Sequence, residues 1–262
     1  MDDLGQLTRW LWAGTTLVEM FLLSLLIVRR NINAYPAFAI YILVTLAQSG
    51  LLFLTIRKWG FASPIAFWIG WGTQALVLGA RAFVVAELSW HILGRFRGIW
   101  ALARWILLSS GTVVLAYALV AAKHDLRLVL NSFELGLELA AAAVIVTLLL
   151  FARYYGVVVS PALRLLAIGL CGYSCISALN DAILERWLAG YVALWNALGM
   201  VAFLSCLLLW SWAFRKFVAQ PAASPLFLDG SAYLKLVPEV NWRLRSLDEA
   251  LIQMWRLETP RS

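Results

Sequence analysis

Long, uninterrupted apolar segments constrain the fold of this chain more than any other feature of its sequence. A helix needs about 20 mainly apolar residues to cross the hydrocarbon core of a bilayer. Hydrophobic residues make up 63% of the 262-residue chain and charged residues 13%, against about 45–50% and about 25% in soluble proteins. Seven segments meet the length requirement, at roughly 10–28, 37–56, 64–92, 99–122, 133–152, 158–180 and 188–214. The sequence therefore predicts an all-α integral membrane protein.

The connections between these segments are short. Neighbouring helices joined by short loops lie side by side and run antiparallel. Pro36, Pro64 and Pro161 each stand close to a predicted helix start, where the missing N–H of proline costs nothing. We therefore expect residues 1–214 to form a compact bundle of seven transmembrane helices. Glycines inside the predicted spans permit close contacts between helices; examples are Gly70, Gly72, Gly169 and Gly172.

The composition changes after Phe214, and residues 215–262 are predicted to form a linker and a tail outside the membrane. Residues 238–257 have the pattern of an amphipathic helix that is too short and too polar to span a bilayer. This helix is expected to lie on the cytoplasmic membrane surface, to dock under the bundle, or to pair with another helix. Its apolar stripe comprises Val240, Leu244, Leu247, Leu251 and Met254.

The distribution of basic residues predicts the orientation of the bundle. With seven spans, fourteen of the 21 lysines and arginines fall on the side of the C-terminal tail, six fall on the other side, and Arg81 lies within a span. Cytoplasmic loops carry an excess of Lys and Arg. The N-terminus is therefore expected outside and the C-terminus in the cytoplasm, in a plasma membrane or a bacterial inner membrane. Without the tail the count is seven against six, so this prediction depends on the tail.

Several classes of function do not fit these residues. The formal net charge of +7 does not indicate nucleic acid, because most basic residues lie at the ends of apolar segments. Two histidines are too few for a multi-histidine metal site or a bis-histidine haem. Cys171 and Cys175 share a helix face within an apolar segment, which indicates small core residues rather than metal ligands or a disulfide. The sequence predicts no cofactor and no metal, and it favours a function other than catalysis.

Ionisable groups inside the predicted spans each need an explanation, since each costs roughly 2.5–3.5 kcal/mol on insertion. Glu19 lies near the centre of the first span and Arg81 lies in the inner half of the third. The two side chains can pair and hold these spans together, although their predicted depths differ by about 12 Å at 1.5 Å per residue. The alternative is that they contact a charged ligand or an ion.

A second polar group is predicted in the outer half of the bundle. Glu138, one turn inside the fifth span, shares this depth with Gln74, Asn180 and Asn196 on three other spans. Four helices that supply polar groups at one level can line a ligand pocket that opens outward. Hydrogen bonds between helices are the alternative, since such bonds join spans in lipid. The candidate ligand-binding residues are therefore Glu138, Gln74, Asn180, Asn196, Glu19 and Arg81.

Glu87 and His91 stand four residues apart near the inner end of the third span. They share one helix face, where they can form an interfacial hydrogen bond, relay a proton or supply two metal ligands. The hydrogen bond is the simplest interpretation because the sequence shows no third ligand at that depth.

Three functions remain as hypotheses. The first is a receptor-like or accessory module that binds a small ligand or partner in its outer half and couples to a separate cytoplasmic partner through residues 238–257. The second is a transporter or channel for an ion or small solute, which the charges inside the membrane suggest. The third is an intramembrane enzyme built on Glu87 and His91.

Overall fold

The structure is a computed structural model of the whole chain. It describes residues 2–60, 63–94, 105, 109, 111–112, 126–154, 157, 159–186, 192–216 and 238–258. Within these ranges the chain is helical and contains no strand. The helices are α1 (Asp2–Val28), η1 (Asn31–Asn33), α2 (Pro36–Trp59), α3 (Pro64–Leu93), α5 (Leu126–Tyr154), α6 (Pro161–Arg186), α7 (Val192–Ala213) and α9 (Pro238–Glu258).

Six of these helices, α1 to α3 and α5 to α7, are long and apolar enough to cross a membrane. The prediction of an all-helical, multi-pass chain is confirmed to that extent. The predicted span at 99–122 lies outside the described residues, apart from four isolated positions. The helices also extend beyond the predicted spans. Hydropathy identifies only the apolar residues that fit the hydrocarbon core of the bilayer, whereas the helix itself continues into the membrane interface. Thus α5 begins at Leu126 and α6 ends at Arg186.

Local sequence signals fix several helix ends. Proline occupies the first position of α2, α3 and α6. Two serines cap helix starts: the backbone N–H of Ala66 donates to the Ser63 hydroxyl at 3.1 Å, and that of Leu163 donates to the Ser160 hydroxyl at 3.2 Å. At the end of α2, Gly60 has φ of 80°, a left-handed conformation that glycine adopts without strain.

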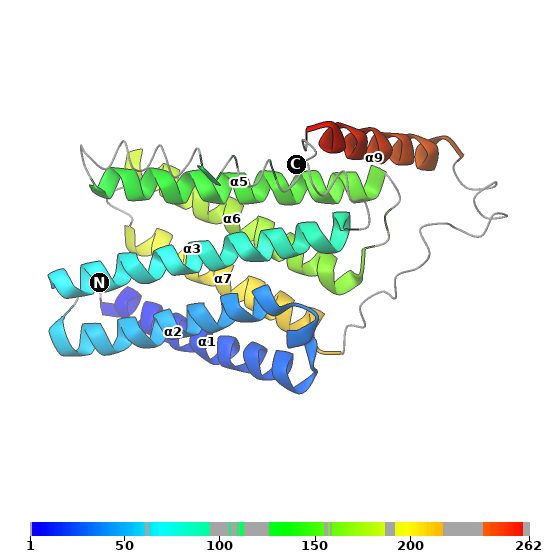
Figure 1. Cartoon of the computed structure of the whole chain (residues 1–262). Helices are drawn as coiled ribbons and strands as arrows, with labels where there is room; N and C mark the ends of the chain where they lie inside the picture. Colours follow the sequence, from blue (N-terminus) through cyan, green and yellow to red (C-terminus); the bar gives the residue numbers. More distant parts are fainter. Residues whose placement is uncertain are drawn as a thin grey trace.

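The six long helices α1 to α3 and α5 to α7 form a closed ring of contacts. Helix α1 packs against α2 and α7, α2 packs against α3, and α7 packs against α6 (Figure 1). Helix α5 packs against both α6 and α3, which completes the ring. Helices α3 and α5 run in the same direction, and the ends of α1, α3, α5 and α7 meet the starts of α2 and α6 at one end of the bundle (Figure 1). We call this end the tail end, since α9 lies beside it.

Aromatic side chains fill the interior near the tail end. Phe38 of α2 packs edge-on against Trp210 of α7, with ring centroids 5.2 Å apart, and stacks on Phe214 at 5.3 Å. Tyr35 and Tyr41 extend this cluster, and all five rings are almost completely buried. Such contacts stabilise the helix pairs beyond the area they bury, by about 0.5–1.5 kcal/mol each. The cluster joins α2 to α7 across the ring.

The outside of the bundle is apolar. Large hydrophobic side chains stand exposed on α3, α5 and α7, among them Trp68 at 61%, Phe83 at 71%, Leu150 at 61% and Leu208 at 54% exposed. A soluble protein rarely exposes a continuous apolar surface of this kind. In a bilayer these side chains face lipid, which agrees with the hydropathy of the same helices.

Helix α9 covers the tail segment that was predicted to be an amphipathic helix. Its Leu244 and Leu251 are buried and belong to the same hydrophobic cluster as the bundle. Leu247 and Met254, which belong to the same predicted stripe, are 45% and 58% exposed. The bundle therefore covers only part of the apolar face of α9.

The contact between α6 and α7 yields a test of this packing. A Cβ atom added at Gly169 would lie 2.5 Å from Nε1 of Trp210, whereas one added at Gly172 would meet nothing within 4 Å. Trp210 is fully buried and donates to the carbonyl of Leu166 at 3.3 Å, so its ring cannot move freely. We expect Gly169→Ala to lower the midpoint of thermal unfolding in detergent, and Gly172→Ala to leave it within error. Equal effects of the two substitutions would contradict this packing.

Candidate functional site: a buried ion pair inside the helix ring

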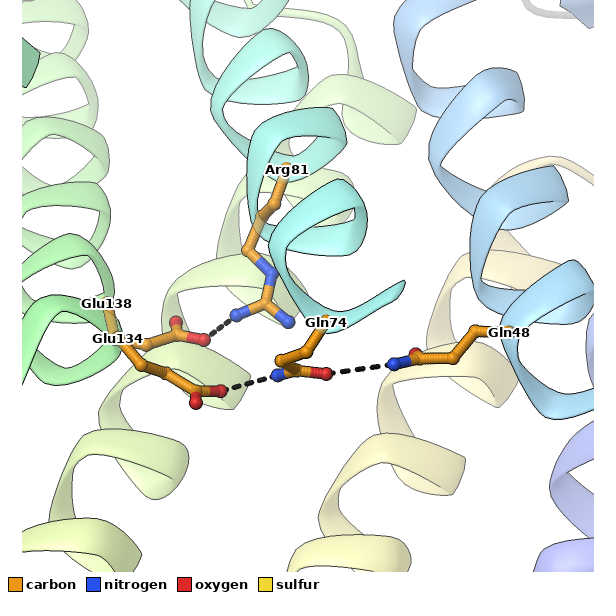
Figure 2. Close-up of polar contacts among 5 residues, drawn as sticks. All are labelled: Gln48, Gln74, Arg81, Glu134 and Glu138. Atoms are coloured by element: carbon orange, nitrogen blue, oxygen red, sulfur yellow. Dashed lines mark hydrogen bonds and ion pairs between the residues drawn. The ribbon is translucent and has the colours of Figure 1, made fainter. Parts of the chain in front are cut away.

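An ion pair joins α3 to α5 inside the ring. The guanidinium group of Arg81 contacts the carboxylate of Glu138, and their side chains are only 5% and 1% exposed (Figure 2). A single buried charge in hydrocarbon is costly, and an opposite charge in direct contact offsets much of that cost. The burial of each charge is therefore explained by the opposite charge beside it. The sequence suggested Glu19 as a partner of Arg81, but in the structure the partner is Glu138.

Two tyrosines from other helices enclose Arg81. Its guanidinium carbon lies 4.8 Å from the ring centroid of Tyr173 on α6 and 5.8 Å from that of Tyr41 on α2. A cation within about 6 Å of a ring centroid is attracted by the π electrons. Arg81 of α3 thus contacts α2, α5 and α6, and it is the polar centre of the ring.

Glu19 forms a separate polar site on the α1 side. Its side chain is 1% exposed, and its carboxyl group interacts with the hydroxyl groups of Thr45 and Ser49 on α2. One carboxyl oxygen, Oε2, has no hydrogen-bond partner among the described residues. Tyr41, whose ring adjoins Arg81, stands on the same helix as Thr45 and Ser49. Helix α2 therefore lies beside both of the charged side chains that the sequence suggested as a direct pair.

A cavity of about 150 Å³ adjoins the ion pair between α3 and α5. Arg81 and Glu138 are the charged residues among those that line it, and most of the others are small or aliphatic. Four polar atoms of these two residues lack a hydrogen-bond partner among the described residues: Nε and Nη1 of Arg81 and both carboxyl oxygens of Glu138. The contact between Arg81 and Glu138 is an ion pair only. The cavity thus combines an apolar lining with one cationic and one anionic group. Its other lining residues are Leu78, Ala82, Val85, Ala86, Gly111, Leu137, Ala140, Ala141 and Val144.

A chain of side-chain hydrogen bonds crosses the ring farther from the tail end. The Gln48 amide of α2 donates to Gln74 of α3 at 3.1 Å, and Gln74 donates to the carboxylate of Glu134 of α5 (Figure 2). Gln48 also donates to the hydroxyl of Thr73 at 3.3 Å. Gln74 is therefore placed between two helices, where it joins α2 to α5, and it is not among the residues that line the cavity.

The two asparagines of the predicted outer group lie elsewhere. Asn180 on α6 approaches Gly199 of α7, and its Oδ1 is buried without a hydrogen-bond partner among the described residues. Asn196 on α7 is exposed. Neither residue lines the cavity with Glu138. Of the six candidate residues, the structure brings Arg81 and Glu138 together at one cavity and places Glu19, Gln74, Asn180 and Asn196 at other points of the ring.

Glu87 has a role that its sequence position did not reveal. Its two carboxyl oxygens accept hydrogen bonds from the backbone N–H groups of Ala37 at 3.0 Å and Phe38 at 3.1 Å. These N–H groups belong to the first turn of α2, where the helix leaves them unpaired and where its dipole favours a negative charge. The available signal was Tyr35, which precedes Pro36 where serines precede the first prolines of α3 and α6. Its side chain makes no capping hydrogen bond, so the N–H groups of the first turn need a partner from elsewhere.

His91 does not pair with the Glu87 carboxylate. Its Nδ1 lies 2.8 Å from the backbone carbonyl oxygen of Glu87, and its ring stacks on Tyr35 at 5.0 Å. Within the described ranges, no three His, Cys, Asp or Glu side chains are grouped as metal ligands would be. The Glu87 and His91 pair thus contributes to the packing of α2 against α3.

Comparisons with protein-family models, with curated proteins and with solved structures found no match to this chain. The function is therefore inferred from the side chains of the ring and from the cavity that they line.

The Arg81–Glu138 pair can be tested by a double-mutant cycle. Arg81→Gln or Glu138→Gln alone leaves one buried charge unpaired, so we expect each to reduce the free energy of unfolding by about 3–5 kcal/mol. The double substitution removes both charges and is expected to cost clearly less than the sum of the single changes. The measurement is unfolding by heat or denaturant in a mild detergent.

A matched control is the exposed pair of Arg245 and Glu249 on α9, whose side chains are 65% and 60% exposed. Arg245→Gln is expected to change stability by no more than about 1 kcal/mol. Additive effects of the Arg81 and Glu138 substitutions would show that the two side chains do not interact.

Proposed function

We propose that the chain is a seven-span, receptor-like module of the cell membrane. It binds a small ligand in the cavity beside Arg81 and Glu138 and passes the resulting change to its cytoplasmic end. The observation that carries this proposal is the ion pair itself. It is almost fully buried, yet its partnerless polar atoms lie at a cavity rather than in tightly packed protein. Charged residues inside a membrane indicate a functional site. Apolar residues can replace a buried ion pair without loss of stability, so stability alone does not explain why the pair is present.

The directions of the helices support a seventh span. Helices α3 and α5 both end at the tail end, so the chain between Leu93 and Leu126 has to return to the opposite end. About 30 residues connect them, and a helix of that length reaches roughly 45 Å. The apolar segment at 99–122 is long enough for this crossing. An odd number of spans puts the N-terminus and the tail on opposite sides.

The charges at the two ends support the proposed orientation. Among the described residues near the helix ends, the tail end carries six basic residues and the far end carries five. Those at the tail end are Arg29, Arg30, Arg153, Arg164, Arg215 and Lys216, and those at the far end are Arg9, Arg57, Lys58, Arg127 and Arg186. Helix α9 adds Arg243, Arg245 and Arg256 beside the tail end, so the excess depends on the tail. Following the positive-inside rule, the tail end faces the cytoplasm. The N-terminus then lies outside.

The cavity favours a ligand of a definite kind. Its wall is largely apolar, so the body of the ligand is apolar, and a polar group of the ligand contacts Arg81 and Glu138. A ligand of this kind reaches the site from the lipid or from water. Because Arg81 also touches α2 and α6, a ligand that displaces the guanidinium group alters the contacts of three helices at once.

Helix α9 supplies the proposed link to a cytoplasmic partner. Its exposed Leu247 and Met254 continue the apolar face that Leu244 and Leu251 bury against the bundle. A helix of a partner protein can cover these exposed side chains. We propose that the partner detects a change in the bundle through this face of α9.

A transporter for an ion or a small solute is the second candidate, because Glu19, Arg81 and Glu138 are buried charges within the spans. The aromatic cluster of Phe38, Tyr41 and Trp210 fills the interior between these charges and the tail end. This packing favours binding over conduction. A transporter is expected to catalyse flux of an ion or solute in liposomes, and Arg81→Gln is expected to change that flux. A receptor-like module is expected to show no flux.

The topology is tested with reporters in living cells. With seven spans, a periplasmic or extracellular reporter is active at the N-terminus and a cytoplasmic reporter is active after Glu258. A reporter placed between α5 and α6 is expected on the cytoplasmic side, like the tail. Both termini on one side would mean an even number of spans and would contradict the proposal.

Ligand binding is tested by blocking the cavity. The purified full-length protein is screened by thermal unfolding against small molecules with an apolar body and one polar group. We expect a member of this set to raise the unfolding midpoint of the wild type, and Ala141→Leu, which fills the cavity, to abolish the rise.

The control is Ala143→Leu, on the exposed face of the same helix, which is expected to keep the response. A rise that survives Ala141→Leu would place binding elsewhere. Flux in liposomes that Ala141→Leu abolishes would favour the transporter.

A further inference from the structure

Four basic residues come together at the tail end, where α1 and α7 finish. Arg29 and Arg30 directly follow the apolar span of α1, and Arg215 and Lys216 closely follow that of α7. All four side chains are exposed. Residues just beyond the end of a spanning helix lie at the level of the lipid headgroups. We call these four residues the basic cluster.

A buried asparagine joins the two halves of the basic cluster. Asn31 is 0% exposed, and its side-chain amide donates to the carbonyl of Phe214 at 3.3 Å and to that of Lys216 at 3.2 Å. The last carbonyl groups of a helix have no partner within the helix, so these bonds dock the end of α1 on the end of α7. Arg30, beside Asn31, has φ of 57°, a left-handed conformation that is uncommon for residues other than glycine. Specific contacts therefore hold the basic residues of the two segments at one place.

The positive charge of the basic cluster is largely uncompensated. None of its four side chains has an ion-pair partner among the described residues. The negative ends of the α1 and α7 dipoles attract cations, but each end is equivalent to only about half a charge, so together they offset roughly one of the four. Glu87, also at the tail end, already accepts hydrogen bonds from the start of α2. The acidic residues of α9 lie on the α5 side of the bundle, away from α1 (Figure 1). The basic cluster is therefore complementary to an anion.

The surface beside the basic cluster is apolar. Leu208 and Trp212 of α7, one helical turn apart, are 54% and 60% exposed. On α1, which packs side by side with α7, Val28 is 77% exposed. The guanidinium carbon of Arg215 lies 3.6 Å from the ring centroid of Trp212. Stacking covers one face of the guanidinium group and leaves the N–H groups along its edge available to bind phosphate.

A ligand that matches this surface combines an anionic group with apolar chains. We propose that the basic cluster binds the phosphate headgroup of an anionic phospholipid, whose acyl chains lie along the exposed apolar side chains of α1 and α7. Clusters of Lys and Arg next to a spanning helix attract anionic lipids. A soluble anion uses the basic side chains alone and gains nothing from the apolar ones. Lipid binding does not depend on the ligand proposed for the cavity beside Arg81 and Glu138, so either proposal can fail alone.

The site is tested with the purified full-length protein in a neutral detergent. Binding of dioleoyl phosphatidylglycerol, dioleoyl phosphatidylcholine and glycerol 3-phosphate is measured by native mass spectrometry and by the rise in the unfolding midpoint. We expect phosphatidylglycerol to bind roughly tenfold or more tightly than phosphatidylcholine, because only phosphatidylglycerol has a net negative charge. Glycerol 3-phosphate is also expected to bind roughly tenfold or more weakly than phosphatidylglycerol, because it has no acyl chains to cover the apolar surface.

Arg30→Gln combined with Arg215→Gln removes one charge from each segment and is expected to weaken phosphatidylglycerol binding by roughly tenfold or more. The matched control combines Arg57→Gln with Lys58→Gln. These two residues also end a spanning helix, and Lys58 lies 4.5 Å from the ring centroid of Trp59, but they belong to one segment at the far end. This control removes the same net charge and is expected to keep the affinity of the wild type for phosphatidylglycerol.

Three results would overturn the proposal. The first is equal affinity for the two phospholipids. The second is an equal loss of affinity in the two double variants, which would show attraction by net charge alone. The third is binding of glycerol 3-phosphate as tight as that of phosphatidylglycerol, which would assign the basic cluster to a soluble anion. The four substituted side chains are exposed, so both double variants are expected to fold, and the comparison of the three ligands on the wild type needs no variant.

Discussion

The absence of water inside a bilayer is the constraint on which this structure depends. A charged side chain in hydrocarbon has no solvent to stabilise it, so it has to find its partner on another helix. Arg81 does so three times, through the carboxylate of Glu138 and the rings of Tyr41 and Tyr173. One arginine thus fixes the position of α3 relative to three neighbours. The apolar contacts between the helices lack this directionality, since lipid tails pack against leucine as well as another leucine does.

Helix α2 connects the separate polar sites. Near its middle, Tyr41 meets Arg81 and Thr45 faces Glu19. At its start, the carboxylate of Glu87 holds the N–H groups of Ala37 and Phe38. Because α3 carries both Arg81 and Glu87, this one helix contacts the ion pair beside the cavity and also the start of α2 at the tail end. The same end contains Tyr35, stacked on His91, and Phe214 at the end of α7. These contacts give the bundle a physical route from its interior to the tail.

The sequence located the polar residues but not their partners. A charge in an apolar segment is rare, and this made three residues candidates for a polar site: Glu19, Arg81 and Glu138. The structure buries all three. Their pairing depends on how far each helix is rotated and tilted. A spacing of 1.5 Å per residue gives the depth along one helix and says nothing about rotation. Gln74 shows the same limit, since it shares a depth with Glu138 but hydrogen-bonds to Gln48 and Glu134.

The sequence by itself determined that this is a helical chain of a membrane, because hydropathy is a sum over neighbouring residues and needs no knowledge of the fold. It also determined several helix ends, through Pro36, Pro64, Pro161 and the serines that precede two of them. Only the tertiary structure decided that Arg81 belongs to Glu138, that Glu87 caps α2, and that Glu19 is left among hydroxyl groups. These are contacts between residues far apart in the chain, and they follow from the closure of the helix ring, which no local pattern of residues encodes.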